Sequence, residues 1–229
     1  MISELENRTE TQETAKVLRG LESHGIKEPA IAAGWTRTLI AGGSTSDIDV
    51  SYVGDIPYPR ARQILRDVLE DVNPYNKSAW DIDGIWNAEQ AYGVAHTVDN
   101  FLLYYLNSID SVYLASDGKL YDPTGMGFED AATKTLRINE YDRANGRVPT
   151  PAEEVNVCLE NCRRLAKFGW TPTSLSAQRI IDGVDAWSLL NSDEKDYFLK
   201  KLRKKYPDSE REAAQEVYEK YGWGFIFSL

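Results

Sequence analysis

The chain has 229 residues, of which 42% are hydrophobic, and its 26 Lys and Arg against 36 Asp and Glu give a formal net charge of −10. This length suits one large domain or two small ones, and the composition excludes a disordered or fibrous chain. The acidic excess excludes broad, unspecific adhesion to nucleic acid or anionic membrane, because the summed field repels phosphates. A local basic patch remains compatible with it.

Three features of the sequence indicate the cellular compartment: the N-terminus, the apolar runs and the cysteines. Met1 precedes a polar, acidic run at residues 3–7, which predicts no signal peptide. The longest apolar run, residues 101–106, is far shorter than the roughly 20 residues that span a bilayer. Cys158 and Cys162 are too few for a disulfide framework, and two isolated histidines predict no zinc site. We therefore expect a cytoplasmic protein with reduced thiols and no membrane partner.

Strand and helix signals alternate in the first half of the chain. Alternation or short apolar runs predict strands at residues 29–34, 47–53, 79–86, 112–114 and 120–121. A hairpin turn joins the last two. Helical periodicity predicts helices at residues 9–24, 35–41, 57–69 and 98–106. Thr9 and Gln12 have the spacing of a capping box.

Strand signals end after Pro123, and helical patterns follow to the C-terminus. The clearest helix start is Thr150-Pro151-Ala152-Glu153, with an N-cap residue, a proline at the first helical position and a returning glutamate. A second such start is predicted at Ser209. The pattern predicts an α+β fold with a small mixed sheet in residues 1–125 and an all-helical part in residues 126–229.

The stretch from residue 33 to residue 50 carries the candidate chemistry. Asp47 and Asp49 lie two apart on a predicted strand, so their carboxylates project from one face. Such a pair alone is usually a solvated strand face, but paired carboxylates also suit a two-Mg²⁺ site that binds a nucleoside triphosphate. The glycine-rich loop before them and a helix starting after Gly34 direct backbone N–H groups toward phosphates. Arg37 is then placed to neutralise charge on the leaving pyrophosphate.

This spacing resembles the nucleotidyltransferase superfamily typified by DNA polymerase beta, and within it the bacterial-type tRNA CCA-adding enzymes and poly(A) polymerases. The opening motif of that branch reads Gly-Gly-x-Val-Arg-Asp, then a Gly, then Asp-x-Asp. The residues that fall in the corresponding register are Gly34, Arg37, Gly42, Asp47 and Asp49. Three residues depart from the motif, because Ala33 replaces the first glycine, Thr36 the valine and Thr38 the acid after arginine.

Two later segments resemble the same family. Residues 117–130 resemble the segment that ends its head domain, and residues 163–170 resemble its neck helix. The resemblance, over residues 29–170, implies a nucleotidyltransferase head followed by a helical neck and short body. It implies transfer of NMP from an NTP, ATP or CTP, to a hydroxyl with release of pyrophosphate. The implied acceptor is an RNA 3′ end, tRNA first.

A third carboxylate is expected from a neighbouring strand, as general base or as a metal ligand. Asp81 and Asp83 are the candidates, and strand parity does not separate them because both project from the same face. The family's acid follows an aromatic residue and precedes an apolar one, as in Trp80-Asp81-Ile82. This favours Asp81 and leaves Asp83 open.

The resemblance also implies contacts to the nucleotide. It assigns them to Gly34, Arg37, Gly43, Ser44, Ser46, Asn100 and Glu154. Asn100 falls where the family has the asparagine of Phe-Thr-Ile-Asn, although Asp99 and Asn100 alternatively cap a helix.

Two departures from the family concern nucleotide selection. The arginines that precede the family's asparagine are replaced by residues 94–96, Val-Ala-His. The neck motif that reads the base, Glu-Asp-x-x-Arg, falls on Glu153-Glu154 with Val157 in place of the arginine. Valine offers no guanidinium to a base edge, and Glu153 has a structural role in the capping box. The family's base specificity is therefore not carried over.

One basic cluster, residues 195–205, has six positive residues and one negative. As the end of a helix it complements the macrodipole without any further function. As an RNA contact it is the best candidate on the chain. The residues concerned are Lys200, Lys201, Arg203, Lys204 and Lys205.

Two alternatives stay open. The first is a small nucleotidyltransferase that modifies a protein or small-molecule hydroxyl, in which Asp47 and Asp49 would serve equally well. The second is a catalytically silent nucleotide-binding relative, which Thr38 and Val157 leave possible.

Overall fold

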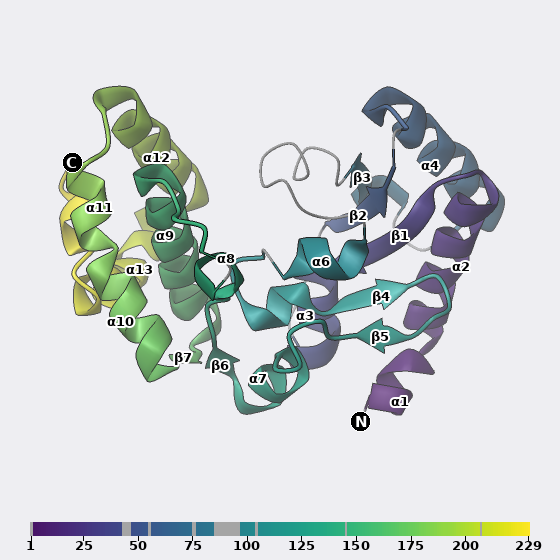
Figure 1. Ribbon diagram of the computed structural model, residues 1–229, viewed down its shortest axis with the longest axis horizontal. Helices are drawn as coiled ribbons and strands as arrows, with labels where there is room; N and C mark the ends of the chain where they lie inside the picture. The colour runs from purple at the N-terminus through teal and green to yellow at the C-terminus, as the bar shows by residue number, and fades with distance from the viewer. Residues whose placement is uncertain are drawn as a thin grey trace. The chain divides into compact units, whose positions relative to one another are not determined.

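The computed structural model describes residues 2–42, 47–54, 56–74, 77–84, 97–103, 105–144, 146–206 and 208–229 (Figure 1). The chain divides into two compact units, Met1–Thr133 and Lys134–Leu229. The boundary expected at residue 125 falls just before helix α7 (Gly127–Thr133), which packs against other elements of the first unit. The two units are described in turn.

A five-stranded mixed sheet forms the centre of the first unit. Its strands are β1 (Lys27–Ala32), β2 (Ile48–Val53), β3 (Trp80–Gly84), β4 (Tyr113–Ala115) and β5 (Leu120–Tyr121). They lie in the order β3-β2-β1-β4-β5, with β2 and β3 parallel and the other neighbours antiparallel. The predicted hairpin around Gly118 is confirmed as the β4–β5 pair. The sheet is therefore small and mixed, as the sequence predicts.

The apolar face of this sheet is covered by α2 (Thr9–Ser23) and α4 (Tyr58–Val72), which lie side by side (Figure 1). Their apolar stripes pack on side chains of β1, β2 and β3, and Val17, Ile31, Val50, Leu65 and Ile82 are all buried in this core. Alternation along β2 explains the arrangement, because Ile48, Val50 and Tyr52 are buried while Asp49 between them is exposed. The opposite face thus carries the acidic residues.

The parallel pairing of β2 and β3 follows from the helix between them. Two parallel strands need a long crossover connection, and α4 supplies it. The tight turn that would join two antiparallel strands is excluded by the run of helical residues from Tyr58 to Val72. Helix α4 ends at Asn73, whose left-handed backbone (φ 51°) terminates it.

Short elements complete the first unit. Helix α3 (Gly34–Ala41) follows β1, and α6 (Val98–Leu102) packs on Ala30, Ala32 and Tyr113 of the second sheet face. The remaining elements are α1 (Ile2–Glu6), α7, and the 3₁₀ turns η1 (Lys77–Ala79) and η2 (Ser108–Ser111). Helix α6 ends at Leu102, so the helix expected to reach residue 106 is shorter.

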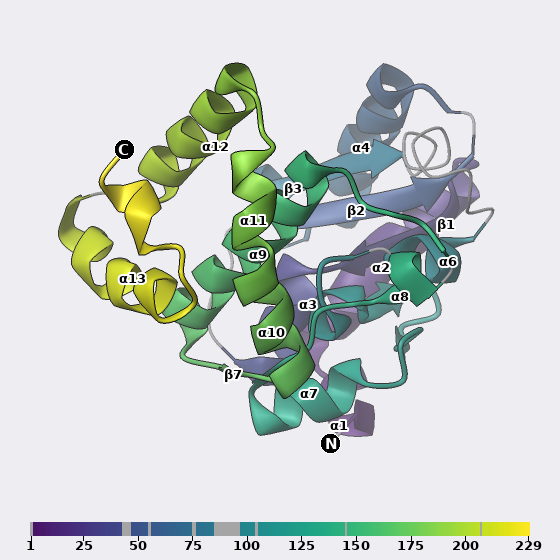
Figure 2. The same ribbon diagram turned by 60° about the vertical axis from the view of Figure 1, so that its left-hand side comes forward.

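The second unit is helical. Its helices are α8 (Tyr141–Ala144), α9 (Pro151–Phe168), α10 (Ser174–Asp182), α11 (Val184–Ser188), α12 (Ser192–Lys205) and α13 (Asp208–Lys220), followed by the 3₁₀ turn η3 (Gly224–Phe227). Helices α10, α11 and α13 pack on α9, and η3 lies beside α13 (Figure 2). Contrary to the all-helical expectation, two short parallel strands, β6 (Thr135–Leu136) and β7 (Thr171–Pro172), pair within this unit.

The observed helix starts agree with the predicted capping residues at one position and differ at others. The capping box at Thr150 is confirmed, because its side chain and that of Glu153 each accept the other residue's backbone N–H, at 3.3 and 2.8 Å. The one predicted at Thr9 is wrong, since α2 begins at Thr9 with Arg8 as its N-cap and no side-chain cap. Helix α13 begins at Asp208, one residue before the predicted Ser209.

Among the described residues, no helix combines the length and the apolar character needed to cross a bilayer.

Candidate functional site

Two neighbouring strands bring two of the predicted carboxylates together. Asp49 on β2 is the register partner of Asp81 on β3, whereas Asp83 is the partner of Ser51. Neighbouring strands lie about 4.8 Å apart, and paired positions of a parallel ladder share one face. Asp47, two residues before Asp49, is on the same face by alternation and is exposed. The backbone therefore gathers positions 47, 49 and 81 at one end of the β2–β3 pair.

The Asp81 carboxylate has contacts of its own. One oxygen, Oδ1, accepts the backbone N–H of Ile82 at 2.9 Å and lies 3.4 Å from Nε of Arg62 on α4. The side chains of Asp81 and Arg62 are each about half exposed, at 48% and 46%. An ion pair so exposed contributes little to stability and exchanges readily for another partner. Asp81 is thus held near Asp49 by its strand, and its half-exposed carboxylate is only weakly paired with Arg62.

The turn between β1 and α3 has a backbone shape that allows an anion to approach its N–H groups closely. Ala33, the N-cap of α3, has φ 55° and ψ −113°, a conformation that residues with a Cβ rarely adopt. Its N–H donates to the carbonyl oxygen of Asp110 in η2 at 3.1 Å. Gly34 begins the helix, so the first-turn N–H groups of α3 lie at the end of the turn. A backbone amide cluster of this kind suits an anion.

Arg37 is fixed by a buried carboxylate that the sequence did not single out. Its Nη1 forms an ion pair with Oδ1 of Asp110, whose residue is 2% exposed. The other oxygen of Asp110 accepts from Nδ2 of Asn107 at 3.0 Å, and the Asn107 side chain in turn accepts the Asp110 backbone N–H at 3.1 Å. Asp110 therefore holds Arg37 from a segment distant in sequence, while the position directly after Arg37 is Thr38.

Thr36 and Thr38, both in α3, donate hydrogen bonds to different parts of the chain. The Thr38 hydroxyl donates to the carbonyl oxygen of Gly34 at 2.9 Å, within α3. The buried Thr36 hydroxyl donates to the carbonyl oxygen of Val112 at 2.9 Å. Together with the Ala33–Asp110 bond, this ties α3 to the segment of η2 and β4.

The described backbone places Asn100 inside α6, which begins at Val98, so Asn100 is no N-cap of this helix. Asn107 is an N-cap instead, because its side chain receives the Asp110 N–H at the start of η2. A signal for Asn107 was present in the sequence: residues 104–107 read Tyr-Tyr-Leu-Asn, an aromatic residue three positions before an asparagine. This is the same pattern as the Phe-Thr-Ile-Asn with which Asn100 was compared.

Three residues assigned to the nucleotide, Gly43, Ser44 and Ser46, lie outside the described residues, as do residues 94–96. The remaining predicted residue of the first unit, Gly34, is at the N-terminus of α3.

Glu154 has partners within the second unit. Its Oε1 and Oε2 accept from Nε and Nη2 of Arg179 at 2.9 and 3.0 Å, and Oε1 also accepts from Nη2 of Arg143 at 2.9 Å. Burial alone would lower the pKa of Arg179, but the hydrogen bonds and charge of Glu154, with Glu140, raise it above its ordinary value. Glu154 is therefore a buried structural anion that positions two arginines.

The predicted RNA-binding residues of α12 separate into two groups. Lys201 and Lys205 turn toward α9, where their Nζ atoms lie 3.0 and 2.5 Å from Oε1 of the buried Glu160. Burial alone would raise the pKa of Glu160, but Arg163 and Lys205 lower it well below its ordinary value. These two lysines therefore join α12 to α9.

The second group on α12 is exposed. Lys200, Arg203 and Lys204 lie at the surface of the helix. Arg203 donates one hydrogen bond, from Nη2 to the carbonyl oxygen of Leu229 at 3.3 Å, and in the part of the chain that the structure describes the two lysines have no partner. Three of the five predicted residues are thus available to an anionic partner.

Known structures were compared with the whole chain. A CCA-adding enzyme in complex with CTP superposes with a TM-score of 0.66 at 12% identity, over 98% of this chain and 55% of the other. The Thermotoga maritima CCA-adding enzyme with tRNA gives 0.62 at 12%, over 98% and 55%. A tRNA nucleotidyltransferase with a primer tRNA and an incoming ATP analog gives 0.61 at 14%, over 90% and 60%. The chain has the fold of the tRNA nucleotidyltransferases.

Sequence comparison adds nothing to this structural likeness. No family model matches the sequence, and the curated proteins give no match. The chain spans a little more than half the length of the solved tRNA nucleotidyltransferase structures named above.

The acids of β2 and β3 and the preceding Asp47 are candidate metal ligands. Within the described ranges, no three His, Cys, Asp or Glu side chains gather closely enough to hold a metal ion. Mg²⁺, however, is commonly bound by one or two carboxylates together with substrate phosphates, not by a cage of protein ligands. Asp47 and Asp49 provide that number of hard oxygen donors on one strand face. The donor set therefore fits Mg²⁺ in the presence of a triphosphate.

The two cysteines take no part in this chemistry. Cys158 and Cys162 are free and buried in α9. Burial raises the pKa of the Cys158 thiol to about 12 and that of Cys162 well above its ordinary value. Both thiols stay protonated at neutral pH and are poor nucleophiles.

Proposed function

We propose that the protein is a metal-dependent nucleotidyltransferase that transfers NMP from an NTP to a hydroxyl and releases pyrophosphate. The observation that supports it best is the register of β2 and β3, which sets Asp81 directly beside Asp49 on the face that also carries Asp47. The fold of the tRNA nucleotidyltransferases is the second support.

Each residue has a distinct task in this reaction. Asp47 and Asp49 hold Mg²⁺, which when bound neutralises triphosphate charge and lowers the pKa of the attacking hydroxyl. Asp81 accepts the proton of that hydroxyl, after its carboxylate turns away from the weakly bound Arg62. The N-terminal amides of α3 receive phosphate oxygens. Arg37, oriented by Asp110, faces the developing charge of the pyrophosphate.

We propose an RNA 3′ end, tRNA first, as the acceptor and ATP or CTP as the nucleotide. The support is the solved structures of this fold in complex with tRNA, with CTP and with an ATP analog. Lys200, Arg203 and Lys204 offer an exposed cationic strip in an otherwise acidic chain. Phosphate contacts of this kind position RNA without reading its sequence.

The experiment is label transfer. The protein is incubated with Mg²⁺, each α-labelled NTP in turn and tRNA lacking its CCA end. We expect labelled tRNA from the wild type, and a loss of about 10²-fold or more from Asp47→Asn and Asp49→Asn with unchanged thermal unfolding. Wild-type-like transfer by both variants would falsify the proposal. Label on a protein or on a small molecule would instead support the alternative acceptor, and nucleotide binding without pyrophosphate release would support the silent relative.

The third carboxylate is tested in the same assay. Asp81→Asn should lower the rate strongly, while Asp83→Asn, whose backbone pairs with Ser51, should lower it far less. Arg62→Ala is the control for the ion pair of Asp81, and we expect it to leave the rate within a few-fold of wild type. A larger loss from Asp83→Asn than from Asp81→Asn would reverse the assignment.

A further inference from the structure

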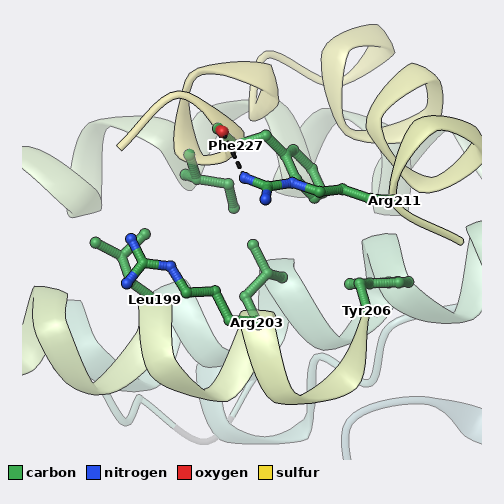
Figure 3. Close-up of a pocket in the computed structure, with 7 residues that line it drawn as sticks. Leu199, Arg203, Tyr206, Arg211 and Phe227 are labelled. Atoms are coloured by element: carbon green, nitrogen blue, oxygen red, sulfur yellow. Dashed lines mark hydrogen bonds between the residues drawn. The ribbon is translucent and has the colours of Figure 1, made fainter. Parts of the chain in front are cut away.

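A pocket of about 360 Å³ lies within the second unit, between α12, α13 and the C-terminal turn (Figure 3). Its size is in the range of small-molecule sites, about 300–1,000 Å³. The lining residues are Leu199, Leu202, Arg203, Tyr206, Arg211, Ile226 and Phe227. Two of them are arginines and none is acidic, in a chain whose net charge is −10. The pocket therefore combines an apolar surface with local positive charge.

The two arginines stand on opposite walls. Arg203 extends from α12, and Arg211 approaches from α13 beside Phe227 (Figure 3). Arg211 donates from Nη2 to the carbonyl oxygen of Phe227 at 2.7 Å, and its guanidinium lies 5.7 Å from the centre of the Phe227 ring. Arg203 donates to the carbonyl oxygen of Leu229. Because a guanidinium has five N–H donors, each arginine keeps several donors for a ligand while these bonds fix its position.

The rest of the pocket is apolar and aromatic. Among the lining residues, Leu202, Tyr206 and Ile226 are buried, and the Tyr206 and Phe227 rings lie 6.3 Å apart, centre to centre. Lys200 and Lys204 are exposed on α12, each next in sequence to a lining residue, Leu199 or Arg203. A flat apolar body with repeated negative charge alongside is the shape of a nucleotide in a single strand, whose base enters the pocket while its phosphates follow the cations.

We propose that this pocket binds one unpaired base of an RNA strand, with the adjoining phosphates on Arg203, Arg211, Lys200 and Lys204. The inference rests on the proposed function for its choice of RNA. It goes beyond that proposal by adding a base pocket to the cationic strip, so RNA with bases is bound more tightly than its sugar-phosphate backbone alone. An unpaired base is required, because bases within a helix are stacked and paired.

The test separates base from backbone. Anisotropy titrations use the full chain, a labelled single-stranded oligoribonucleotide and an abasic oligonucleotide of the same length. Leu199→Trp fills the pocket without changing charge, and Tyr197→Trp, at an exposed position of the same helix outside the lining, is its control. We expect Leu199→Trp to weaken binding of the intact strand about fivefold or more, while the abasic strand and the control change little.

Charge is tested separately. Arg203→Ala should weaken both oligonucleotides, and Lys16→Ala, which removes one exposed positive charge from α2, should weaken neither by as much. Thermal unfolding of all four variants shows whether they are folded.

Three results would overturn the inference: no binding of the intact strand by the wild type, equal affinity for both strands, or an unchanged affinity of Leu199→Trp. Self-association of the wild type that Leu199→Trp abolishes, with RNA affinity unchanged, would assign the pocket to a second copy of the chain. Label transfer is measured independently of these titrations. The base pocket and the proposed nucleotide transfer are therefore tested independently of each other.

Discussion

Asp110 is a single buried residue that joins three parts of the candidate site. Its side chain holds Arg37 and Asn107, and its carbonyl oxygen receives the N–H of Ala33. Removing one partner of a buried ion pair leaves the other charge uncompensated, which typically costs 3–5 kcal/mol, so we expect Asp110→Ala to lose about that much stability. Urea unfolding measures it.

The control for Asp110 is Asp71→Ala, at an exposed position of α4 where no partner is found among the described residues. Its stability should change by about 0.5 kcal/mol or less. Equal losses of stability in Asp110→Ala and Asp71→Ala would contradict the stabilising role of the buried Asp110 contacts.

Glu160 predicts a pH dependence of stability. Its pKa is lowered in the folded protein, chiefly by Arg163 and Lys205 acting against burial. A lowered folded-state pKa gives stability that is fully present above the unfolded pKa of about 4.3 and is lost as pH falls. Glu160→Gln should therefore be less stable than wild type at pH 7, and the difference should shrink as pH falls from about 5 toward 3.

Denaturant unfolding at several pH values checks this behaviour. Glu22→Gln, at an exposed position of α2 with no charged partner in the described structure, is the matched control and should stay close to wild type throughout. A stability difference for Glu160→Gln that is constant between pH 7 and pH 3 would contradict the electrostatic explanation.

At the scale of elements, the β1–α3 turn contains a residue that strains it. Ala33 adopts φ 55° and ψ −113°, which costs a residue with a Cβ about 1–3 kcal/mol. Glycine relieves that strain but has about 0.4–1 kcal/mol more unfolded-state entropy to lose. We expect Ala33→Gly to stabilise the protein by about 1 kcal/mol, which calorimetry detects as a higher Tm.

The opposite sign is expected where the backbone is helical. Ala177→Gly, inside α10, should lower stability by about 0.5–1 kcal/mol. If Ala33→Gly also lowers stability, steric strain at the Ala33 Cβ is not what limits the stability of this turn.

The elements show what local patterns can and cannot predict. Alternation along residues 47–53 predicts β2 and its polar face, and the capping box at Thr150 predicts the start of α9, because both signals lie within a few residues. The partner of a strand is set by contacts distant in sequence. That is why parity alone left Asp81 and Asp83 equivalent until the β2–β3 register separated their positions.

The same limit explains why the partners of several candidate site residues were not predicted. Asp110 lies 73 residues from the arginine it holds, and Glu154 lies 25 residues from Arg179. A family motif gave Glu154 to the nucleotide because the sequence shows its position but not its partners. Likewise, a run of cations on α12 does not reveal that Lys201 and Lys205 turn inward to Glu160.

For the whole molecule, charge limits how RNA is bound. The net charge of −10 disfavours phosphate contacts over most of the surface and favours local groups of exposed cations such as Lys200, Arg203 and Lys204. Each neutralised phosphate of a single strand contributes about −0.7 to the slope of log K against log salt, so the four proposed phosphate contacts, Lys200, Arg203, Lys204 and Arg211, predict a slope of about −3. Titrations at several KCl concentrations measure it, and Lys200→Ala should reduce its size by about 0.7. A slope steeper than about −5 would require contacts beyond this strip.

The parallel pairing of β2 with β3 has a consequence for how the acids tolerate change. The loop and helix between the two strands fix which residue of β3 lies opposite Asp49, and a slip of one residue would turn every β3 side chain to the other face. A slip of two residues restores the face and sets position 83 where position 81 was. Since both positions hold aspartate, Asp83 would then lie beside Asp49 in the place of Asp81. Insertions or deletions that shift β3 by two residues could therefore preserve a carboxylate beside Asp49, whereas shifts by one could not.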